Sequence, residues 1–224
     1  MTVKIAKVFQ ALTYWPIYGF FRFFTHYQIE GQENLKGLED RAIIFASNHA
    51  SYIDGPISAA SMPRSGLYPK NFSPIRFLAW KKFFGVFGQF PFPISIPIML
   101  YVKFNGSIPI EKASGDLFKA LREVIKELKA GAKIWIFPEG GITKDGKLQQ
   151  GKRGIAFLHQ QTNVPVVPVA LMGTFGILSL KTFLRQKKVK IRIGKPIYDL
   201  GNASLEEGVN IVMREIGKLL VPIS

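Results

Sequence analysis

The sequence contains no cysteine and only three histidines among its 224 residues. Without cysteine, the chain has no disulfide, no thiolate metal ligand and no cysteine nucleophile. Because His26, His49 and His159 are the only histidines, a multi-histidine zinc site is not expected and no metal is predicted. A histidine that acts as a general base must be one of these three.

Acidic residues are also scarce, because 15 Asp and Glu stand against 30 Lys and Arg and leave a net charge of +15. Residues 55–110 contain no acid at all, and their cations alternate with aromatic and aliphatic residues. This mixture is typical of a surface that contacts anionic lipid headgroups and the acyl boundary beneath them. A second run, residues 181–195, holds seven cations and no acid, and we interpret it as a solvated face.

Nucleic acid is the other polyanion that such a charge attracts. The sequence has no helix-turn-helix, zinc-finger or ribonucleoprotein signature, and its aromatic residues gather in long apolar runs rather than on a basic stacking surface. We therefore expect an anionic membrane surface, and no nucleic acid, as a partner. The expected location is peripheral or monotopic, on the cytoplasmic face of a membrane.

Short runs rich in β-branched and aromatic residues predict strands, and apolar residues at 3.6-residue spacing predict helices between them. The strands are expected at residues 42–46, 133–137, 166–171 and 189–193. Ser114 is expected to cap one helix, and Ser204 with Glu207 forms a capping box before the last helix. No linker divides the chain, so the sequence predicts a single α/β domain whose mostly parallel sheet is flanked by helices.

Two uncharged apolar segments are notable. Residues 8–21 are too short to span a bilayer, which takes ~20 apolar residues, and they predict an in-plane docking helix that Pro16 breaks or kinks. A core helix is the alternative. Residues 83–102 are long enough to span but contain three prolines, so we expect a loop that dips into one leaflet. A buried pair of strands is the alternative there.

The first chemical motif is Asn48-His49 with Asp54, directly after the first predicted strand. Neither a helix nor a strand places residues five apart on one side, so only a turn brings His49 and Asp54 together. Gly55-Pro56 predicts that a helix starts there. An aspartate on one imidazole nitrogen fixes the tautomer and leaves the other nitrogen to take a proton from a hydroxyl. A merely structural His–Asp pair is the alternative.

The second motif, Phe137-Pro138-Glu139-Gly140-Gly141, follows the strand predicted at residues 133–137. Carboxyl ends of parallel strands meet at one edge of a sheet, so this segment and the His49 loop should emerge together. The carboxylate of Glu139 could hold an acceptor hydroxyl, and the glycines let backbone amides approach a phosphate or an oxyanion. An ordinary turn is the alternative.

Together these motifs resemble the glycerolipid acyltransferases, in particular the 1-acyl-sn-glycerol-3-phosphate (lysophosphatidic acid) acyltransferases. Asn48-His49 with Asp54 resembles the first block of that family, and Phe137-Pro138-Glu139-Gly140 matches the third. The second block is similar to residues 106–112 and the fourth to residues 164–170. Four blocks in the right order, over roughly residues 40 to 172, make the resemblance specific.

The resemblance implies His49 as the catalytic base and Asp54 as the residue that orients it. It further implies that Gly106, Lys112, Glu139 and Gly140, with the adjacent Gly141, bind the acceptor. The acyl donor would be acyl-CoA or acyl carrier protein, which serves as co-substrate, and no cofactor is expected. Residues 1–28 would form the membrane-docking segment and residues 29–224 the acyltransferase domain.

Two positions depart from the family pattern. The second block usually ends in arginine, where this chain has Lys112, which offers a point charge rather than a bidentate fork to phosphate. The third block usually continues Thr-Arg-Ser, whereas residues 141–143 here carry no cation. Lys144, Lys147, Lys152 and Arg153 follow as possible substitutes. Lysophosphatidic acid is the leading acceptor, with another lysophospholipid or a glycolipid as the alternative.

Two rival functions remain from the residues alone. Ser47 and Ser51 flank His49, which suggests a lipid hydrolase, but no Gly-x-Ser-x-Gly elbow is present and a serine two residues from its base aligns poorly. The high charge suggests a non-enzymatic polyanion binder, for which no motif was found.

Overall fold

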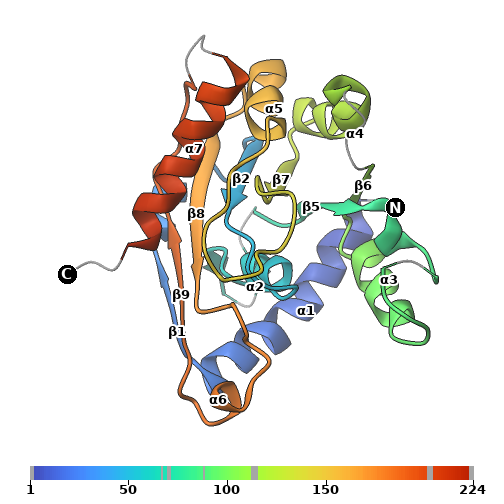
Figure 1. Cartoon of the computed structure of the whole chain (residues 1–224), viewed down its shortest axis with the longest axis vertical. Coiled ribbons are helices and arrows are strands. Elements are labelled where there is room, and N and C mark those ends of the chain that lie inside the picture. Colours follow the sequence, from blue (N-terminus) through green and yellow to red (C-terminus); the bar gives the residue numbers. More distant parts are fainter. Residues whose placement is uncertain are drawn as a thin grey trace.

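The computed structural model describes residues 3–66, 68–69, 72–87, 89–111, 116–200 and 204–221. Its centre is a seven-stranded sheet in the order β1-β9-β8-β2-β7-β5-β6 (Figure 1). The strands of this sheet are β1 His26–Glu30, β2 Ile43–Ser47, β5 Ile75–Trp80, β6 Ile108–Ile110, β7 Lys133–Ile136, β8 Val166–Met172 and β9 Lys188–Ile193. A separate two-stranded hairpin pairs β3 Arg64–Ser65 with β4 Tyr68–Pro69.

The five strands from β8 to β6 run parallel to one another. Only β9, which is antiparallel to β8, and its parallel neighbour β1 run the other way. The predicted α/β domain with a mostly parallel sheet is therefore confirmed. The carboxyl ends of β2, β7 and β8 lie at the same edge of the sheet, as the argument from the two motifs required.

Helices cover both faces of the sheet (Figure 1). They are α1 Val3–Phe24, α2 Asp54–Ala60, α3 Ser95–Phe104, α4 Leu117–Lys129, α5 Gly154–Thr162, α6 Leu180–Phe183 and α7 Leu205–Leu220, with 3-10 turns at Gln32–Leu35 and Lys81–Phe84. The protein has two hydrophobic cores, and strand β2 contributes to each of them. Phe45 packs with the side chains of α1 and α2, whereas Ile44 packs with those of α4, α5 and α7. This alternation follows from the two-residue period of a strand.

Each of the four predicted strands is present with its limits shifted by one residue at most, whereas β1, β5 and β6 were not predicted. Ser204 caps α7 and accepts a hydrogen bond from the Glu207 amide at 3.3 Å. Ser114 lies outside the described residues. The residue that caps α4 is Asp116, whose carboxylate accepts from the Lys119 amide at 3.0 Å.

Of the predicted break or kink at Pro16, the break is absent. Helix α1 runs through Pro16 for 22 residues. The amide that proline lacks would have bonded the carbonyl of Leu12, and the Leu12 side chain is 71% exposed, so the missing bond lies on the outer side of the helix. On the inner face of the helix, Tyr14 before the proline and Phe21 after it are both buried and hold the helix in place.

One face of α1 is buried, as a core helix requires, and the other is apolar and exposed, so docking of α1 to a membrane stays a prediction. Gln10 fixes the buried face: its Nε2 donates to the carbonyls of Ile75 and Asn105 at 2.6 and 3.0 Å, and its Oε1 accepts from the Ile75 amide at 2.9 Å. The exposed apolar residues are Val3, Ile5, Val8, Leu12, Trp15 and Phe23. In the described ranges, no helix combines the length and the apolarity needed to cross a bilayer.

The apolar segment 83–102 is neither a leaflet-dipping loop throughout nor a pair of strands. Its second half belongs to α3, which begins at Ser95. Pro97 is tolerated because it lies in the first turn, where an amide has no partner within the helix, and the carbonyls of Pro91 and Pro93 accept from Ser95 and Ile96. Only Ser95 of α3 is buried, so most of this helix is partly exposed.

The Gln10 contacts predict a large loss of stability on truncation. In Gln10→Ala, the Ile75 amide and two carbonyls would be left buried without partners, which should lower the free energy of unfolding by about 2–4 kcal/mol. Denaturant unfolding measures this change. Leu12→Ala, on the exposed face of the same helix, should change it little, and equal losses in the two variants would contradict the assignment.

Candidate active site

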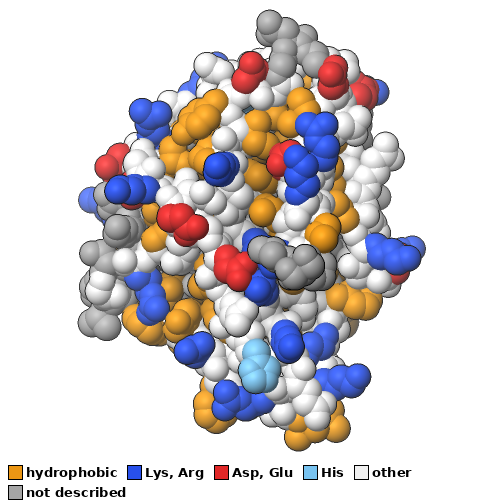
Figure 2. Space-filling model, turned by 90° about the vertical axis from the view of Figure 1, so that its left-hand side faces the viewer, with side chains coloured by type: hydrophobic (Ala, Val, Ile, Leu, Met, Phe, Trp, Pro, Cys, Tyr) orange, Lys and Arg blue, Asp and Glu red, His pale blue; other side chains and the backbone are white. Residues whose placement is uncertain are grey.

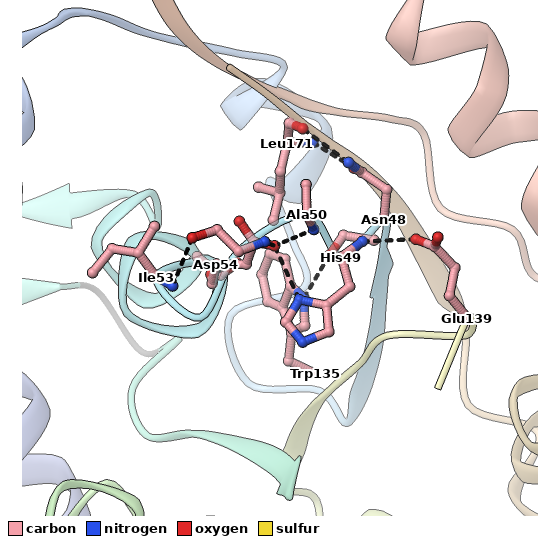
Figure 3. Close-up of polar contacts among 11 residues, drawn as sticks. Asn48, His49, Ala50, Ile53, Asp54, Trp135, Glu139 and Leu171 are labelled. Atoms are coloured by element: carbon pink, nitrogen blue, oxygen red, sulfur yellow. Dashed lines mark hydrogen bonds and ion pairs between the residues drawn. The ribbon is translucent and has the colours of Figure 1, made fainter. Parts of the chain in front are cut away.

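His49 and Asp54 meet because one turn folds the chain back between β2 and α2. Oδ2 of Asp54 accepts hydrogen bonds from the amides of Ala50 at 2.6 Å and Ser51 at 2.8 Å, and it lies 3.0 Å from Nδ1 of His49 (Figure 3). Asp54 is the first residue of α2, and Pro56 lies in the first turn, close to the predicted start. The aspartate thus closes the loop and orients the imidazole at once.

The pairing fixes which imidazole nitrogen is available for chemistry. A carboxylate accepts hydrogen bonds, so Nδ1 carries the proton that it donates to Asp54, and Nε2 is left with its lone pair. No residue in the described part of the chain hydrogen-bonds Nε2, and the His49 side chain is 17% exposed, whereas Asp54 is fully buried. The geometry therefore presents a base to the surface and hides the group that orients it.

The imidazole ring is also held by an aromatic face. Phe137 stacks on it with ring centroids 3.9 Å apart and an angle of 13° between the planes. Phe137 follows β7, which lies beside β2 in the sheet, so the two predicted motifs are side by side. Stacking on one side and Asp54 at Nδ1 restrict the ring to one orientation, which general-base catalysis requires.

Asn48 ties the same loop to the strand on the other side. Its Nδ2 donates to the Leu171 carbonyl at 2.9 Å, and its Oδ1 accepts from the Leu171 amide at 2.7 Å (Figure 3). The Asn48 side chain thus continues the β2–β8 pairing with two further hydrogen bonds. The sequence motif gives Asn48 no role of its own, because its partner lies 123 residues away along the chain and no local pattern reveals it.

Glu139 is buried against the His49 loop rather than open to an acceptor. Its Oε1 accepts from the His49 amide at 2.7 Å, and its Oε2 accepts from the Gln149 amide at 2.9 Å. Burial raises the pKa of Glu139 above its usual range, while the two backbone hydrogen bonds act in the opposite direction. Both carboxylate oxygens are occupied, so in this structure the side chain positions His49, and a direct contact with an acceptor stays a prediction.

The loop after Glu139 encloses the backbone of His49. The Thr143 amide donates to the His49 carbonyl at 2.8 Å, opposite the bond from the His49 amide to Glu139. Between them, Gly140 has a φ of +69°, a conformation that favours glycine, and a Cβ at Gly141 would meet no atom within 4 Å. The amide of Gly141 donates to no residue in the described ranges, so it is available to a ligand.

Lys152 is a cation that this loop brings close to the motif. Its amide donates to the Pro138 carbonyl at 2.8 Å, and its side chain lies along Gly140, where a Cβ would come within 2.6 Å of the Lys152 Nζ. The side chain is exposed, and no acid in the described part of the structure pairs with it. Of the four cations suggested by the sequence, this one lies against the third block.

The second block lies farther away, on the edge strand β6. Gly106 precedes β6 at the amino end, has a φ of +77°, and packs so closely under α1 that a Cβ would lie 2.7 Å from that of Ala6. This contact gives Gly106 a packing role. Gly106 contacts none of the described residues around His49, so its predicted contact with the acceptor stays a prediction. Lys112 lies outside the described residues. Two strands, β5 and β7, separate β6 from β2.

The other histidines do not share these features. Nδ1 of His159 lies 2.9 Å from the Val164 carbonyl and the residue is buried, whereas His26 begins the edge strand β1. Across the described ranges, no three His, Cys, Asp or Glu residues group closely enough to hold a metal ion. His49 is thus the histidine that combines a buried aspartate with an accessible nitrogen.

Comparisons with known proteins agree with this geometry. The family model described as Acyltransferase matches residues 26–172. The chain is 29% identical over 222 residues to the chloroplastic 1-acyl-sn-glycerol-3-phosphate acyltransferase BAT2 of Brassica napus, with 93% of this chain and 56% of that protein covered. It is 30% identical over 197 residues to the chloroplastic 1-acyl-sn-glycerol-3-phosphate acyltransferase LPAT1 of Arabidopsis thaliana, with 87% and 48% covered. The chain spans about half the length of these curated relatives.

A solved structure shows the same fold. The 1-acyl-sn-glycerophosphate acyltransferase PlsC from Thermotoga maritima matches this chain with a TM-score of 0.64 and 24% sequence identity. The match covers 96% of this chain and 77% of that one, so it includes α1 as well as the sheet.

The Glu139 contacts predict that its amide analogue weakens the His49 loop. In Glu139→Gln, the carboxamide has one acceptor oxygen for two amide donors, so the free energy of unfolding should fall by about 1–3 kcal/mol. Hydrogen exchange at the His49 and Gln149 amides should become faster. Glu123→Gln, whose side chain is 55% exposed on α4, is the control and should alter neither.

The raised pKa of Glu139 gives this loss a pH dependence. A carboxyl group whose folded pKa lies above its unfolded value, about 4.3, contributes stability below that value and loses it as pH rises through the folded pKa. Glutamine does not titrate, so the gap between the two proteins should narrow as pH rises through this window. A gap that widens would contradict the direction of the shift.

Proposed function

This chain belongs to the acyltransferase family, and we propose that it transfers a fatty acyl group from a thioester to the free hydroxyl of lysophosphatidic acid in phospholipid biosynthesis. The observation that carries the proposal is the His49–Asp54 pair, whose Nε2 is free, at the carboxyl end of β2. The names of the relatives support the acceptor, because the two plant proteins are 1-acyl-sn-glycerol-3-phosphate acyltransferases.

In the proposed reaction the acceptor hydroxyl attacks the thioester carbonyl directly. Nε2 of His49 takes the hydroxyl proton as the oxygen–carbon bond forms, and Asp54 stabilises the resulting imidazolium through Nδ1. The tetrahedral intermediate then collapses, the carbon–sulfur bond breaks, and the proton passes from His49 to the departing thiolate. The products are the acylated lipid and the free thiol of coenzyme A or of acyl carrier protein.

The surroundings of the two nearby serines argue against a covalent acyl-serine. Ser47 is fully buried, and its Oγ accepts a hydrogen bond from Nε1 of Trp135 at 2.9 Å. Oγ of Ser51 accepts a long hydrogen bond, 3.4 Å, from the Ile53 amide. Neither hydroxyl is hydrogen-bonded to His49 in the described structure, so direct attack by the acceptor is the simpler route.

The loop after Glu139 is the proposed place for the negative charges of the reaction. The unused Gly141 amide can donate to the oxyanion or to the acceptor phosphate, as its open surroundings allow. Gly106, Lys112, Glu139 and Gly140 stay in the proposed acceptor site on the family resemblance. For Glu139 this role is indirect, because its oxygens already hold the backbone of His49 and Gln149.

Lys152 is proposed to take the place of the arginine that the third block lacks. Its ammonium group lies over Gly140, one residue from the carboxylate that holds His49. A phosphate bound at the Gly140–Gly141 backbone would therefore meet a positive charge within reach of a flexible side chain. Lysine gives a point charge instead of a fork, so it favours an anionic headgroup without fixing its orientation.

The enzyme is proposed to work at a membrane surface, with acyl-CoA or acyl carrier protein as donor. The outer face of α1 and the neighbouring α3 form an open apolar groove lined by Lys4, Ile5, Val8, Phe9, Leu12 and Phe104. Exposed aliphatic and aromatic side chains beside lysines suit the boundary between headgroups and acyl chains. We propose peripheral or monotopic attachment, on the cytoplasmic leaflet.

The first prediction from this mechanism concerns the base and its partner. His49→Ala should abolish transfer of labelled acyl groups to lysophosphatidic acid with either donor, and Asp54→Asn should lower kcat by roughly 100- to 10,000-fold with little change in the acceptor KM. Activity is measured in vesicles, and circular dichroism checks that each variant is folded. Ser51→Ala is the control and should keep most of the activity. An active His49→Ala enzyme would overturn the mechanism.

The second prediction concerns acceptor recognition. Lys152→Gln should raise the KM for lysophosphatidic acid roughly tenfold and change kcat little, because a charge-assisted contact to phosphate is lost. Lys147→Gln, in the same loop, is the matched control and should leave the KM unchanged. Equal effects in the two variants would mean that Lys152 acts only through the general charge of the loop.

A further inference from the structure

The connection between β8 and β9, residues 173–187, extends from the sheet at the edge where the carboxyl end of β8 lies (Figure 1). It contains the short helix α6, and we call it the α6 hairpin. Five of its large apolar side chains are exposed, namely Phe175, Leu178, Leu180, Phe183 and Leu184. Leu178 and Leu180 are the most prominent, at 83% and 73% exposure.

The α6 hairpin has a fixed frame that holds these side chains outward. Ile177 is 2% exposed and belongs to the core, and its carbonyl accepts a hydrogen bond from the buried hydroxyl of Thr182. The Phe183 ring contacts the end of α1 through Phe24, with ring centroids 5.6 Å apart. The exposure of the leucines therefore belongs to the folded arrangement and is not a consequence of a loose loop.

Exposed cations lie beside these apolar side chains, and no acidic residue lies near them in the sequence. The sequence has no Asp or Glu from residue 146 to residue 198. Lys181, Arg185 and Lys188 are exposed on the hairpin or at its end, and the Arg185 guanidinium lies 5.8 Å from the centroid of the Phe23 ring on α1. Figure 2 shows hydrophobic and basic side chains gathered together at this lower end of the molecule.

The basic run 181–195, interpreted from sequence as a solvated face, thus has two parts. Lys190 and Arg192 both bond the carboxylate of Glu30 at 2.8 Å and are used within the sheet. The cations before them lie between exposed leucines and phenylalanines. Neither part is therefore a plain solvated face, because Lys190 and Arg192 are ion-paired and the cations before them lie beside exposed apolar side chains.

The α6 hairpin is joined closely to the catalytic loop. Asn48 binds both backbone groups of Leu171, two residues before the hairpin begins. The Phe175 ring packs against Gly146, where a Cβ would lie 3.1 Å from it, so the hairpin also touches the loop that follows Glu139. A surface that binds the hairpin would lie near both segments that surround His49.

We propose that the α6 hairpin is a second membrane contact, separate from the α1–α3 groove, and that it binds anionic lipid. Leu178, Leu180 and Leu184 would enter the acyl boundary, while Lys181, Arg185 and Lys188 contact lipid headgroups. Charge complementarity favours an anionic bilayer, and Phe23 makes the hairpin continuous with the exposed apolar face of α1. The choice of lipid as partner rests on the proposed function.

The absence of cysteine from the sequence makes a direct test simple. Leu178→Cys is labelled with a polarity-sensitive fluorophore and mixed with vesicles of phosphatidylglycerol and phosphatidylcholine, some carrying nitroxide-labelled acyl chains. The emission should shift to the blue and be quenched by the nitroxide. Phe118→Cys, exposed to 54% on α4 at the opposite end of the molecule, is the matched control and should show neither change.

Vesicle sedimentation measures the contribution to affinity. Leu178→Ser with Leu180→Ser should lower the partition coefficient roughly tenfold or more, and Lys181→Gln should lower it roughly fivefold on anionic vesicles only. Phe118→Ser and Lys119→Gln on α4 should leave it unchanged. These measurements need no acyl transfer, so an inactive protein that still shows the α6 contact would reject the proposed function and keep this inference.

Two outcomes would overturn the inference. One is a label at Leu178 whose emission and quenching by nitroxide change no more than those of the label at Phe118, although the protein binds vesicles through α1. The other is a leucine double variant that binds vesicles normally but turns over more slowly with acyl carrier protein than with acyl-CoA. That result would assign the hairpin to the protein that carries the acyl donor.

Discussion

One carboxylate oxygen determines the shape of the proposed active site. Oδ2 of Asp54 receives two backbone amides and the imidazole of His49, so the turn and the orientation of the base depend on the same atom. A loop of five residues has too few contacts to hold a side chain by packing alone. The buried aspartate supplies what packing does not, and its place at the start of α2 adds the favourable end of the helix dipole.

The parallel sheet then brings two distant braces to that loop. Asn48 connects it to β8 across 123 residues of chain, and Glu139 connects it to the segment after β7 across 90. Each brace bonds backbone groups, so the position of His49 is set independently of the side chains that surround its ring. The two braces come from the strands on either side of β2, which is why a central strand carries the base.

Much of this arrangement follows from the sequence, and the remainder has identifiable physical causes. The strands on either side of β2, β7 and β8, are buried and rich in apolar residues, which pattern alone reveals. By contrast, β1 is a half-exposed edge strand and β6 has three residues. The His49–Asp54 turn was predictable because every regular alternative separates the two side chains. The role of Glu139 was not, since a carboxylate that bonds two amides and one that binds a substrate have the same sequence pattern.

Pro16 shows why local rules fail where tertiary contacts dominate. Its lost hydrogen bond falls on the outer side of α1, while on the inner side Gln10 bonds to Ile75 of β5 and Tyr14 is buried. The helix survives because packing supplies more stability than one exposed backbone bond removes.

The same division between inner and outer groups separates the proposed base from the cations that we propose for acceptor and lipid recognition. His49 is fixed by buried or backbone partners. Lys152, by contrast, is exposed and touches the loop after Glu139 only at Gly140, and the cations of the α6 hairpin are exposed on the surface. A substitution among these cations alters the surface charge, and it leaves the bonds that orient the imidazole intact. The third block of this chain has no arginine, and the hydrogen bonds that hold His49 do not require one. The absence of that arginine is therefore compatible with the same orientation of His49.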